Sequence, residues 1–319
     1  MSNFFDITKE IYKSFLTECE AVKVPEDFAE ITNAIFNKLK WRTKVNTYKI
    51  ADIVVPEPEE NKKVYVGLSA GLDSVYQATH LKALGYEVTA VHLKGLNKQS
   101  AEQEYASAKS IAQKLGIKLI VVNFKTPKQE LPDNPFKNQL VLSIMLDRGI
   151  KEGVYRYALG SDWCSSLNAS AEKFTLTDSI EVNKSFENFV KKHYKPFELL
   201  FIDEKVKKVQ RLGYIMQNNM ALFEDISSCI SPQRFRQYWK AECEKKYRIG
   251  LPKNRCGKCY KCCMEYLLLC ELGLGLKQEG YYNYCWQVLA KSKNSHYSSL
   301  FDLKLPLEKR RQNLLNYGS

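Results

Sequence analysis

The sequence lacks any long hydrophobic run. Its 319 residues contain no stretch that approaches the ~20 consecutive apolar residues of a membrane-spanning helix. The first residues, Met1-Ser-Asn-Phe-Phe-Asp, also lack the basic and apolar regions of a secretory signal. Because 45% of the residues are hydrophobic and 26% are charged, we expect a packed core. The composition therefore predicts a soluble, cytoplasmic protein that does not enter a membrane.

Acidic residues are scarce in the second part of the chain. Residues 1–181 contain 23 Lys and Arg and 23 Asp and Glu, whereas residues 182–319 contain 25 and 13. The whole excess behind the net charge of +12 therefore lies in the second part. A solvated basic surface explains it as well as an anionic partner does, either ATP or a nucleic acid.

A loop of small residues lacks the lysine of the P-loop. The apolar run Val64–Leu68 predicts a buried strand, and the pattern after Ser74 predicts a helix. Between them stands Ser69-Ala-Gly-Leu-Asp-Ser74, which we call the small-residue loop. Backbone N–H groups and the helix dipole at such a turn can bind a phosphate. No lysine ends the loop, so it does not have the P-loop pattern Gly-x-x-x-x-Gly-Lys-Ser/Thr. The alternative to a phosphate site is an ordinary turn between a strand and a helix.

The small-residue loop resembles the Ser-Gly-Gly-x-Asp-Ser motif of the ATP pyrophosphatases, the PP-loop family. These enzymes cleave ATP between the α- and β-phosphates and activate a substrate oxygen as its adenylate. Ala70 replaces the usual glycine, and alanine would be strained there if the position needs a positive φ. The resemblance implies that Asp73 and Ser74 are catalytic, with Mg²⁺ bound beside Asp73. The residues implied in ATP binding are Ser69, Ala70, Gly71, Leu72, Asp73, Ser74 and Gly160.

Strands and helices alternate after Val64. Apolar runs predict strands over Val64–Leu68, Val88–Leu93, Ile117–Phe124 and Val154–Leu159, with helices between them. Repeated units of this kind predict an α/β fold with a doubly wound parallel sheet. Ligands of such sheets bind at the carboxyl ends of the strands. We therefore expect Asn138, Asp162 and Trp163 to face the acceptor substrate.

The chain is expected to have three consecutive parts. Residues 1–60 predict an N-terminal helical module, with one helix through Ile7, Ile11 and Phe15 and a second that starts at Pro25 and runs to Leu39. Residues 61–200 form the nucleotide-binding domain. Residues 201–319 form a helical C-terminal lobe that carries most of the cysteines.

Cysteines crowd near the end of the chain. Two overlapping Cys-x-x-Cys units join Cys256, Cys259 and Cys262, a spacing typical of a metal knuckle. Tetrahedral zinc needs a fourth ligand. The candidates are Cys229, Cys243, Cys263 and Cys270. An iron–sulfur cluster and plain apolar packing remain alternatives.

The cysteine pattern resembles that of the 7-cyano-7-deazaguanine synthases, a branch of the PP-loop family. Their zinc site has a Ser-Cys followed by Cys-Gly-x-Cys-x-x-Cys, which matches Ser228-Cys229 and Cys256–Cys262. The resemblance implies structural Zn²⁺ held by Cys229, Cys256, Cys259 and Cys262. Residues 230–255 then form an insertion, and Cys243 inside it remains the rival fourth ligand.

This second resemblance implies the reaction. A carboxylated 7-deazapurine attacks ATP, ammonia displaces AMP, and the amide can go on to a nitrile. An alternative is a PP-loop enzyme that thiolates tRNA, which would need a metal-free redox cysteine; Cys164 is the best placed. A third hypothesis is a synthase-like nucleotide-binding subunit of a modification or defence system, with a protein or RNA partner. The oligomeric state stays open, with a homodimer as one alternative.

Overall fold

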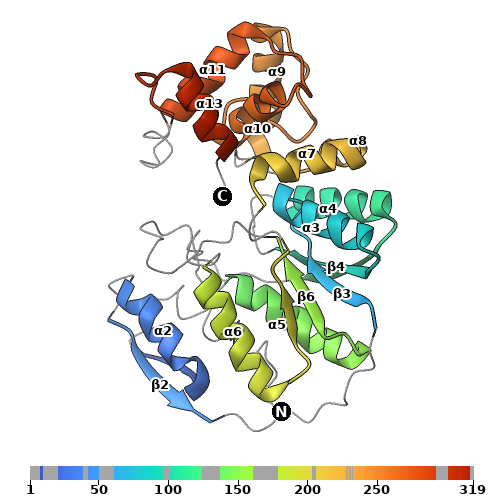
Figure 1. The fold of residues 1–319 in the computed structure, drawn as a ribbon, viewed down its shortest axis with the longest axis vertical. Coiled ribbons are helices and arrows are strands. Elements are labelled where there is room, and N and C mark those ends of the chain that lie inside the picture. The colour runs from blue at the N-terminus through green and yellow to red at the C-terminus, as the bar shows by residue number, and fades with distance from the viewer. Residues whose placement is uncertain are drawn as a thin grey trace. The chain divides into compact units, whose positions relative to one another are not determined.

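The chain divides into two compact units, each built from separate stretches of sequence (Figure 1). The sheet unit comprises residues 1–68, 80–96 and 117–204, and the helical unit comprises residues 69–79, 97–116 and 205–319. The boundaries expected near residues 60 and 200 stay a prediction about domains. The computed structural model describes residues 8–9, 21–38, 42–49, 61–95, 101–123, 137–160, 179–202, 206–227, 229, 231, 233–291 and 301–316.

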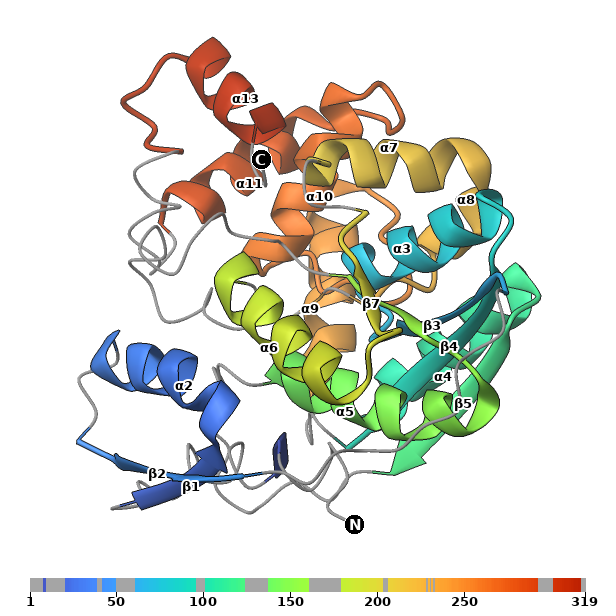
Figure 2. The same cartoon turned by 60° about the horizontal axis from the view of Figure 1, so that its bottom comes forward.

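The centre of the sheet unit is a five-stranded parallel sheet in the order β5-β4-β3-β6-β7 (Figures 1 and 2). The expected α/β class is confirmed, and the four expected strands are present. The fifth strand, β7, was not expected, because three residues are too short for a periodic pattern. The bounds are β3 Lys63–Gly67, β4 Glu87–Lys94, β5 Lys118–Asn123, β6 Arg156–Leu159 and β7 Glu198–Leu200.

The strand order reverses between β3 and β6. The chain runs outward from β3 through β4 to β5, then returns to add β6 and β7 on the other side of β3. The last residues of the two central strands, Gly67 and Leu159, are register partners. A Cβ atom at Gly67 would lie 2.7 Å from Leu159 Cδ2, so a larger residue here would require the Leu159 side chain to shift. This reversal is the switch point at which doubly wound sheets bind ligands.

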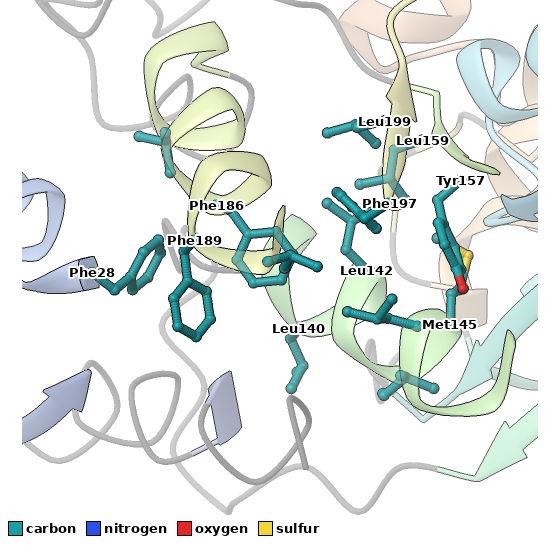
Figure 3. Close-up of a cluster of buried hydrophobic side chains, with 14 of the residues drawn as sticks. Phe28, Leu140, Leu142, Met145, Tyr157, Leu159, Phe186, Phe189, Phe197 and Leu199 are labelled. Carbon is teal, nitrogen blue, oxygen red and sulfur yellow. The ribbon is translucent and has the colours of Figure 1, made fainter. Parts of the chain in front are cut away.

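The apolar core of the sheet unit lies between the sheet and two helices. The helix α5, Lys137–Gly149, packs on β3 and β6, and α6, Ile180–His193, packs on α5. Figure 3 shows Phe186 and Phe189 from α6 together with Leu140 and Leu142 from α5. Burial of such side chains contributes about 1.5–3 kcal/mol each. Apolar packing therefore holds this unit together.

The N-terminal part contains a helix, as expected, and two strands, of which the first was not expected and the second overlaps the segment Val45–Val55 that the sequence offers as an edge strand. The helix α2, Glu26–Lys38, contacts α6, where the rings of Phe28 and Phe189 lie 5.6 Å apart (Figure 3). The strand β1, Ala21–Pro25, pairs in parallel with β2, Lys44–Tyr48. Pro25 thus ends a strand, whereas we expected it to begin a helix. The other expected helix, with Ile7 and Phe15, lies mostly outside the described residues.

The helical unit consists of helices that contact one another in small groups. The helix α10 packs against α11 and α13, α7 packs against α8, and α4 contacts α8. Among the described residues, no helix has the length and hydropathy needed to cross a membrane. The bounds are α3 Leu72–Ala83, which continues into the sheet unit, α4 Ala101–Leu115, α7 Lys208–Asn218, α8 Met220–Phe223, α9 Gln233–Tyr247, α10 Tyr260–Glu271, α11 Glu279–Ala290 and α13 Leu307–Asn316.

Candidate nucleotide site and cysteine cluster

The small-residue loop is a tight turn at the start of α3. Ser69 Oγ lies 3.2 Å from Ser74 Oγ, and Ser74 Oγ donates to the Gly71 carbonyl at 3.0 Å. The first helical bond runs from Val75 N to Gly71 O, so the backbone N–H groups before it have no acceptor within the helix. Such groups at a helix N-terminus can bind a phosphate.

Ala70 has a positive φ of 63° and is fully buried. The strain expected from the sequence is therefore present, since an L-residue in the left-handed region costs about 1–2 kcal/mol. The Ala70 carbonyl accepts a hydrogen bond from Ser227 N at 2.8 Å. This bond holds the strained residue in place.

Asp73 is surrounded by basic side chains. Arg211 Nη1 donates to Asp73 Oδ1 at 2.7 Å, and Lys208 Nζ lies 3.9 Å from Asp73 Oδ2. Burial alone raises the pKa of Asp73, but the charges of Lys208 and Arg211 outweigh it and hold the pKa below its usual value; Lys261 adds to this effect. Three cations beside one carboxylate leave a positive surplus at the loop. That surplus suits a polyphosphate.

The sequence argument missed these basic residues. Lys208 and Arg211 both belong to α7. The structure begins α7 at Lys208, where the Lys207 N–H donates to Gln210 Oε1 at 2.8 Å. The run Lys207-Lys208-Val-Gln-Arg211 was the available signal, because it places Lys208 and Arg211 on one helical face.

The remaining predicted site residues are spread over the sheet unit. Gly160 follows β6 and is half-buried, and Asn138 lies half-buried in the first turn of α5. The predicted substrate residues Asp162 and Trp163, and the candidate redox residue Cys164, lie outside the described residues.

Four cysteines from two distant stretches come together in the helical unit. The sulfur atoms of this cysteine cluster all lie within 4.8 Å of one another. Cys259 Sγ lies 3.4 Å from Cys262 Sγ and 3.9 Å from Cys229 Sγ, and Cys256 Sγ lies 3.9 Å from Cys262 Sγ. Trp239 of α9 packs against the cluster. The members are Cys229, Cys256, Cys259 and Cys262, the four residues expected from the sequence.

The knuckle around Cys256 supports a thiolate. Its sulfur accepts hydrogen bonds from Lys258 N at 3.3 Å, Cys259 N at 3.2 Å and Ser231 Oγ at 3.0 Å. Gly257 makes the turn with a φ of 74°, and a Cβ atom there would lie 2.6 Å from Leu251 Cδ1. Glycine is therefore required at this position for two independent reasons.

Cys243 is not part of the cluster. It is 2% exposed, and burial raises the pKa of its thiol to about 11, so it stays protonated near neutral pH. Cys263 is fully buried and its Sγ lies 3.8 Å from the Gly257 carbonyl, while Cys270 is half-buried farther along α10. Of the candidates for a fourth partner, only Cys229 has its sulfur atom within 4.8 Å of all three knuckle sulfur atoms in the described part of the chain.

The geometry of the cluster fits a single tetrahedral metal ion. With Zn–S bonds of about 2.3 Å, four tetrahedral sulfur atoms lie about 3.8 Å apart, close to the observed spacings. A four-iron cluster would hold the sulfurs farther apart, because each sulfur binds a different iron. These cysteines could therefore hold Zn²⁺.

The cluster and the loop belong to the same unit and share short connections. Ser227, two residues before Cys229, binds the Ala70 carbonyl. Lys261, adjacent to Cys262, contributes to the positive field at Asp73. Formation of the cluster therefore helps to fix the residues that surround the loop.

Part of the chain is similar to known proteins. A family profile described as the tRNA methyl transferase HUP domain matches residues 62–141, which contain the small-residue loop. The tRNA-specific 2-thiouridylase MnmA of Francisella tularensis subsp. tularensis (strain WY96-3418) is 26% identical over 209 residues, covering 56% of this chain and 57% of the relative. The same enzyme from subsp. novicida (strain U112) has the same identity and coverage. The chain thus matches little more than half the length of these relatives.

A solved structure, the U34-tRNA thiolase NcsA from Methanococcus maripaludis with its [4Fe-4S] cluster, is 20% identical. The match covers 74% of this chain and 76% of that chain, with a TM-score of 0.37.

The parallel sheet, the loop after its central strand and the profile match indicate that residues 62–141 belong to a HUP domain of the PP-loop type. The curated relatives are tRNA thiouridylases, and they do not support the resemblance to the deazaguanine synthases.

Proposed function

We propose that this protein uses ATP to replace a carbonyl oxygen of an RNA base by sulfur. The base oxygen attacks the α-phosphorus of ATP, which releases pyrophosphate and leaves the oxygen bonded to AMP. Hydrosulfide then adds to the same carbon and AMP departs, so that a C=O bond becomes C=S. This corresponds to the second of the functions expected from the sequence.

The basic surroundings of the small-residue loop carry the proposal. Arg211 and Lys208 lie beside Asp73 at the start of α3, where a pyrophosphate leaving group needs positive charge. The similarity to 2-thiouridylases and the excess of basic residues after residue 181 support RNA as the acceptor. A carboxylated small molecule has no such support.

The residues of the loop have distinct tasks in this scheme. The N–H groups at the start of α3 and the Ser74 hydroxyl bind the β- and γ-phosphates. Arg211 stabilises the charge that develops on pyrophosphate as the bond to the α-phosphorus breaks. Asp73 would hold Mg²⁺, which would supply positive charge to the leaving group.

The cysteine cluster is proposed to hold structural Zn²⁺. Four thiolates leave no open position on the ion, so these residues would fix the fold around the loop without taking part in chemistry. Metal analysis of the purified protein should find about one zinc per chain. Iron with a visible charge-transfer band would contradict this assignment.

The test is nucleotide and nucleoside analysis of one reaction. The full chain is incubated with ATP, Mg²⁺, tRNA and inorganic sulfide, and the RNA is digested for mass spectrometry. We expect AMP and pyrophosphate that depend on tRNA, and a nucleoside in which sulfur replaces oxygen. Asp73→Asn should lower both products by at least about 10²-fold, whereas Asp27→Asn, which alters a surface aspartate on α2, should not.

Two results would overturn the proposal. Formation of ADP and phosphate alone would exclude cleavage at the α-phosphorus. Conversion of 7-carboxy-7-deazaguanine to its amide in the presence of ammonia, without sulfur in tRNA, would favour the synthase hypothesis instead.

A further inference from the structure

The helical unit contains a pocket of about 720 Å³ that the proposed chemistry does not use. This volume is within the range of about 300–1,000 Å³ typical of small-molecule sites. Apolar side chains from several elements line it, among them Met216, Phe223, Tyr266 and Leu269. The pocket therefore suits a ligand with an apolar or aromatic body.

One buried guanidinium in the pocket wall lacks a full set of partners. Arg255 is 2% exposed; its Nε lies 2.5 Å from Glu265 Oε2, and its Nη1 donates to the Ile226 carbonyl. Its Nη2 is buried and has no hydrogen-bond partner within the described part of the chain. A buried donor without a partner costs about 1–3 kcal/mol. A ligand that brings an acceptor to Nη2 would remove this cost.

The charged residues that line the pocket determine which kind of hydrogen-bond acceptor can bind to Arg255. Glu265 is 4% exposed and also lines the pocket, so its carboxylate offsets the charge of Arg255. A phosphate would be repelled by that carboxylate, whereas a neutral carbonyl would not. Two exposed cations, Arg248 and Lys277, line the pocket as well and can attract a chain of phosphates.

We propose that this pocket binds an unpaired nucleobase of the acceptor RNA, with a base carbonyl accepting from Arg255 Nη2. The proposal rests on the thiolation function, which supplies the RNA. Phe223 and Tyr266 offer aromatic surfaces of the kind that bind splayed-out bases. An aliphatic side chain of a peptide has no acceptor and would leave Arg255 Nη2 without a hydrogen bond.

The pocket is joined to the small-residue loop by two consecutive residues. Arg255 binds the Ile226 carbonyl, and the next residue, Ser227, donates to Ala70 at 2.8 Å. A base bound against Arg255 therefore rests on the segment that supports the loop.

The test is binding without ATP, measured by anisotropy of labelled single-stranded oligonucleotides. Uracil has ring carbonyls and adenine has none, so oligo(U) should bind at least about tenfold more tightly than oligo(A). Arg255→Lys keeps the charge beside Glu265 but removes the second N–H arm, and should abolish this preference. Gly250→Trp should block binding, because a Cβ atom at Gly250 meets nothing within 4 Å and the residue lines the pocket.

A matched pair of leucines controls for surface effects. Leu276 lines the pocket and is 95% exposed, whereas Leu84 is 54% exposed in the sheet unit. Leu276→Asp should weaken oligo(U) binding and Leu84→Asp should not; circular dichroism and metal content check the fold of every variant. Equal binding of oligo(U) and oligo(A), or unchanged binding in a folded Gly250→Trp, would overturn the pocket assignment. If that variant still thiolates tRNA normally, only the pocket is wrong; if wild type never thiolates tRNA, the proposed function fails instead.

Discussion

The two units of this protein are stabilised by different kinds of interaction. In the sheet unit the core is made of aliphatic and aromatic side chains from β3–β7, α2, α5 and α6. In the helical unit, charged groups are buried as well. Among the described residues, the buried Arg, Lys, Asp and Glu side chains all belong to the helical unit: Arg211, Arg236, Arg255 and Glu265.

We interpret this difference as a division of roles: the sheet unit mainly stabilises the fold, and the helical unit contains the residues proposed for the reaction. Apolar burial is non-directional and tolerates substitution of one hydrophobic residue by another. A buried ion pair destabilises the fold strongly when one partner is lost, so it persists where its geometry is needed. The helical unit contains the small-residue loop, the cysteine cluster and the pocket. It is also the unit with the buried charged side chains, whose burial costs free energy of folding. The following experiments test this contrast, beginning with the largest expected effect.

Loss of the proposed zinc site should unfold the helical unit and spare the sheet unit. Cys259→Ser, or removal of metal by a strong chelator, removes binding energy that is part of the folding energy, about 10 kcal/mol or more. Hydrogen exchange should show loss of protection in α9 and α10 but not in β3 and β4.

Cys270→Ser is the matched control, because Cys270 lies on α10 outside the cluster. Equal loss of protection in both units would mean that they unfold together. This result would contradict the claim that different interactions stabilise the two units.

Removal of an aromatic side chain from the apolar core should destabilise the sheet unit and leave the metal content of the helical unit unchanged. Phe186 is fully buried in the sheet unit, and Phe186→Ala should lower the free energy of unfolding by about 3–5 kcal/mol. Denaturant unfolding measures this loss. Metal content should be unchanged, and a variant that loses zinc together with stability would contradict the separation.

Arg211 should matter for turnover more than an exposed arginine does. Arg211→Met removes the partner of Asp73 and should lower pyrophosphate release by at least about 10²-fold, equivalent to about 2.7 kcal/mol. Arg148→Met, which alters an exposed ion pair of α5, should have no effect. Full activity in a folded Arg211→Met would exclude it from the reaction.

The stability of the helical unit should depend on pH through Asp73. Its pKa is lowered in the folded protein, chiefly because the charges of Lys208 and Arg211 outweigh burial. The contribution is therefore complete above the unfolded pKa of about 4 and is lost as the pH falls below it. Unfolding of wild type and Asp73→Asn, measured from pH 7 to pH 3, should differ most at pH 7 and converge in acid. A constant difference would contradict this.

The smallest effect is expected at Ala70. Glycine would relieve the strain of its φ of 63°, but would also make the unfolded chain more flexible. Ala70→Gly should therefore change the free energy of unfolding by less than about 1 kcal/mol. A destabilisation of several kcal/mol would show that the methyl group packs at a site that needs it.

The sheet could be predicted from the sequence because hydrophobic periodicity encodes it locally. Val88–Leu93 and Ile117–Phe124 each form an almost continuous apolar run, and both became strands. β1 and β7 escaped prediction because strands of five and three residues carry too little pattern.

The surroundings of the loop could be predicted only in part. The Cys-x-x-Cys spacing is local, so the knuckle was visible, and Cys229 was found through the resemblance. The pairing of Asp73 with Arg211 spans 138 residues and depends on where α7 begins. No pattern in a single sequence reports such a contact, and the same holds for Arg255 and the pocket.

The division of the chain has a consequence for its synthesis. The polypeptide passes between the two units at five points. The segment 69–79, which begins with the small-residue loop, belongs to the same unit as residues 205–319. A ribosome adds about 5–20 residues per second, so the loop emerges many seconds before Arg211 and Ser227 exist. Until then Ala70 has no donor to hold its strained backbone, and Asp73 has no arginine. The nascent chain can therefore build the strands early, but its nucleotide site matures only when the last third has been translated.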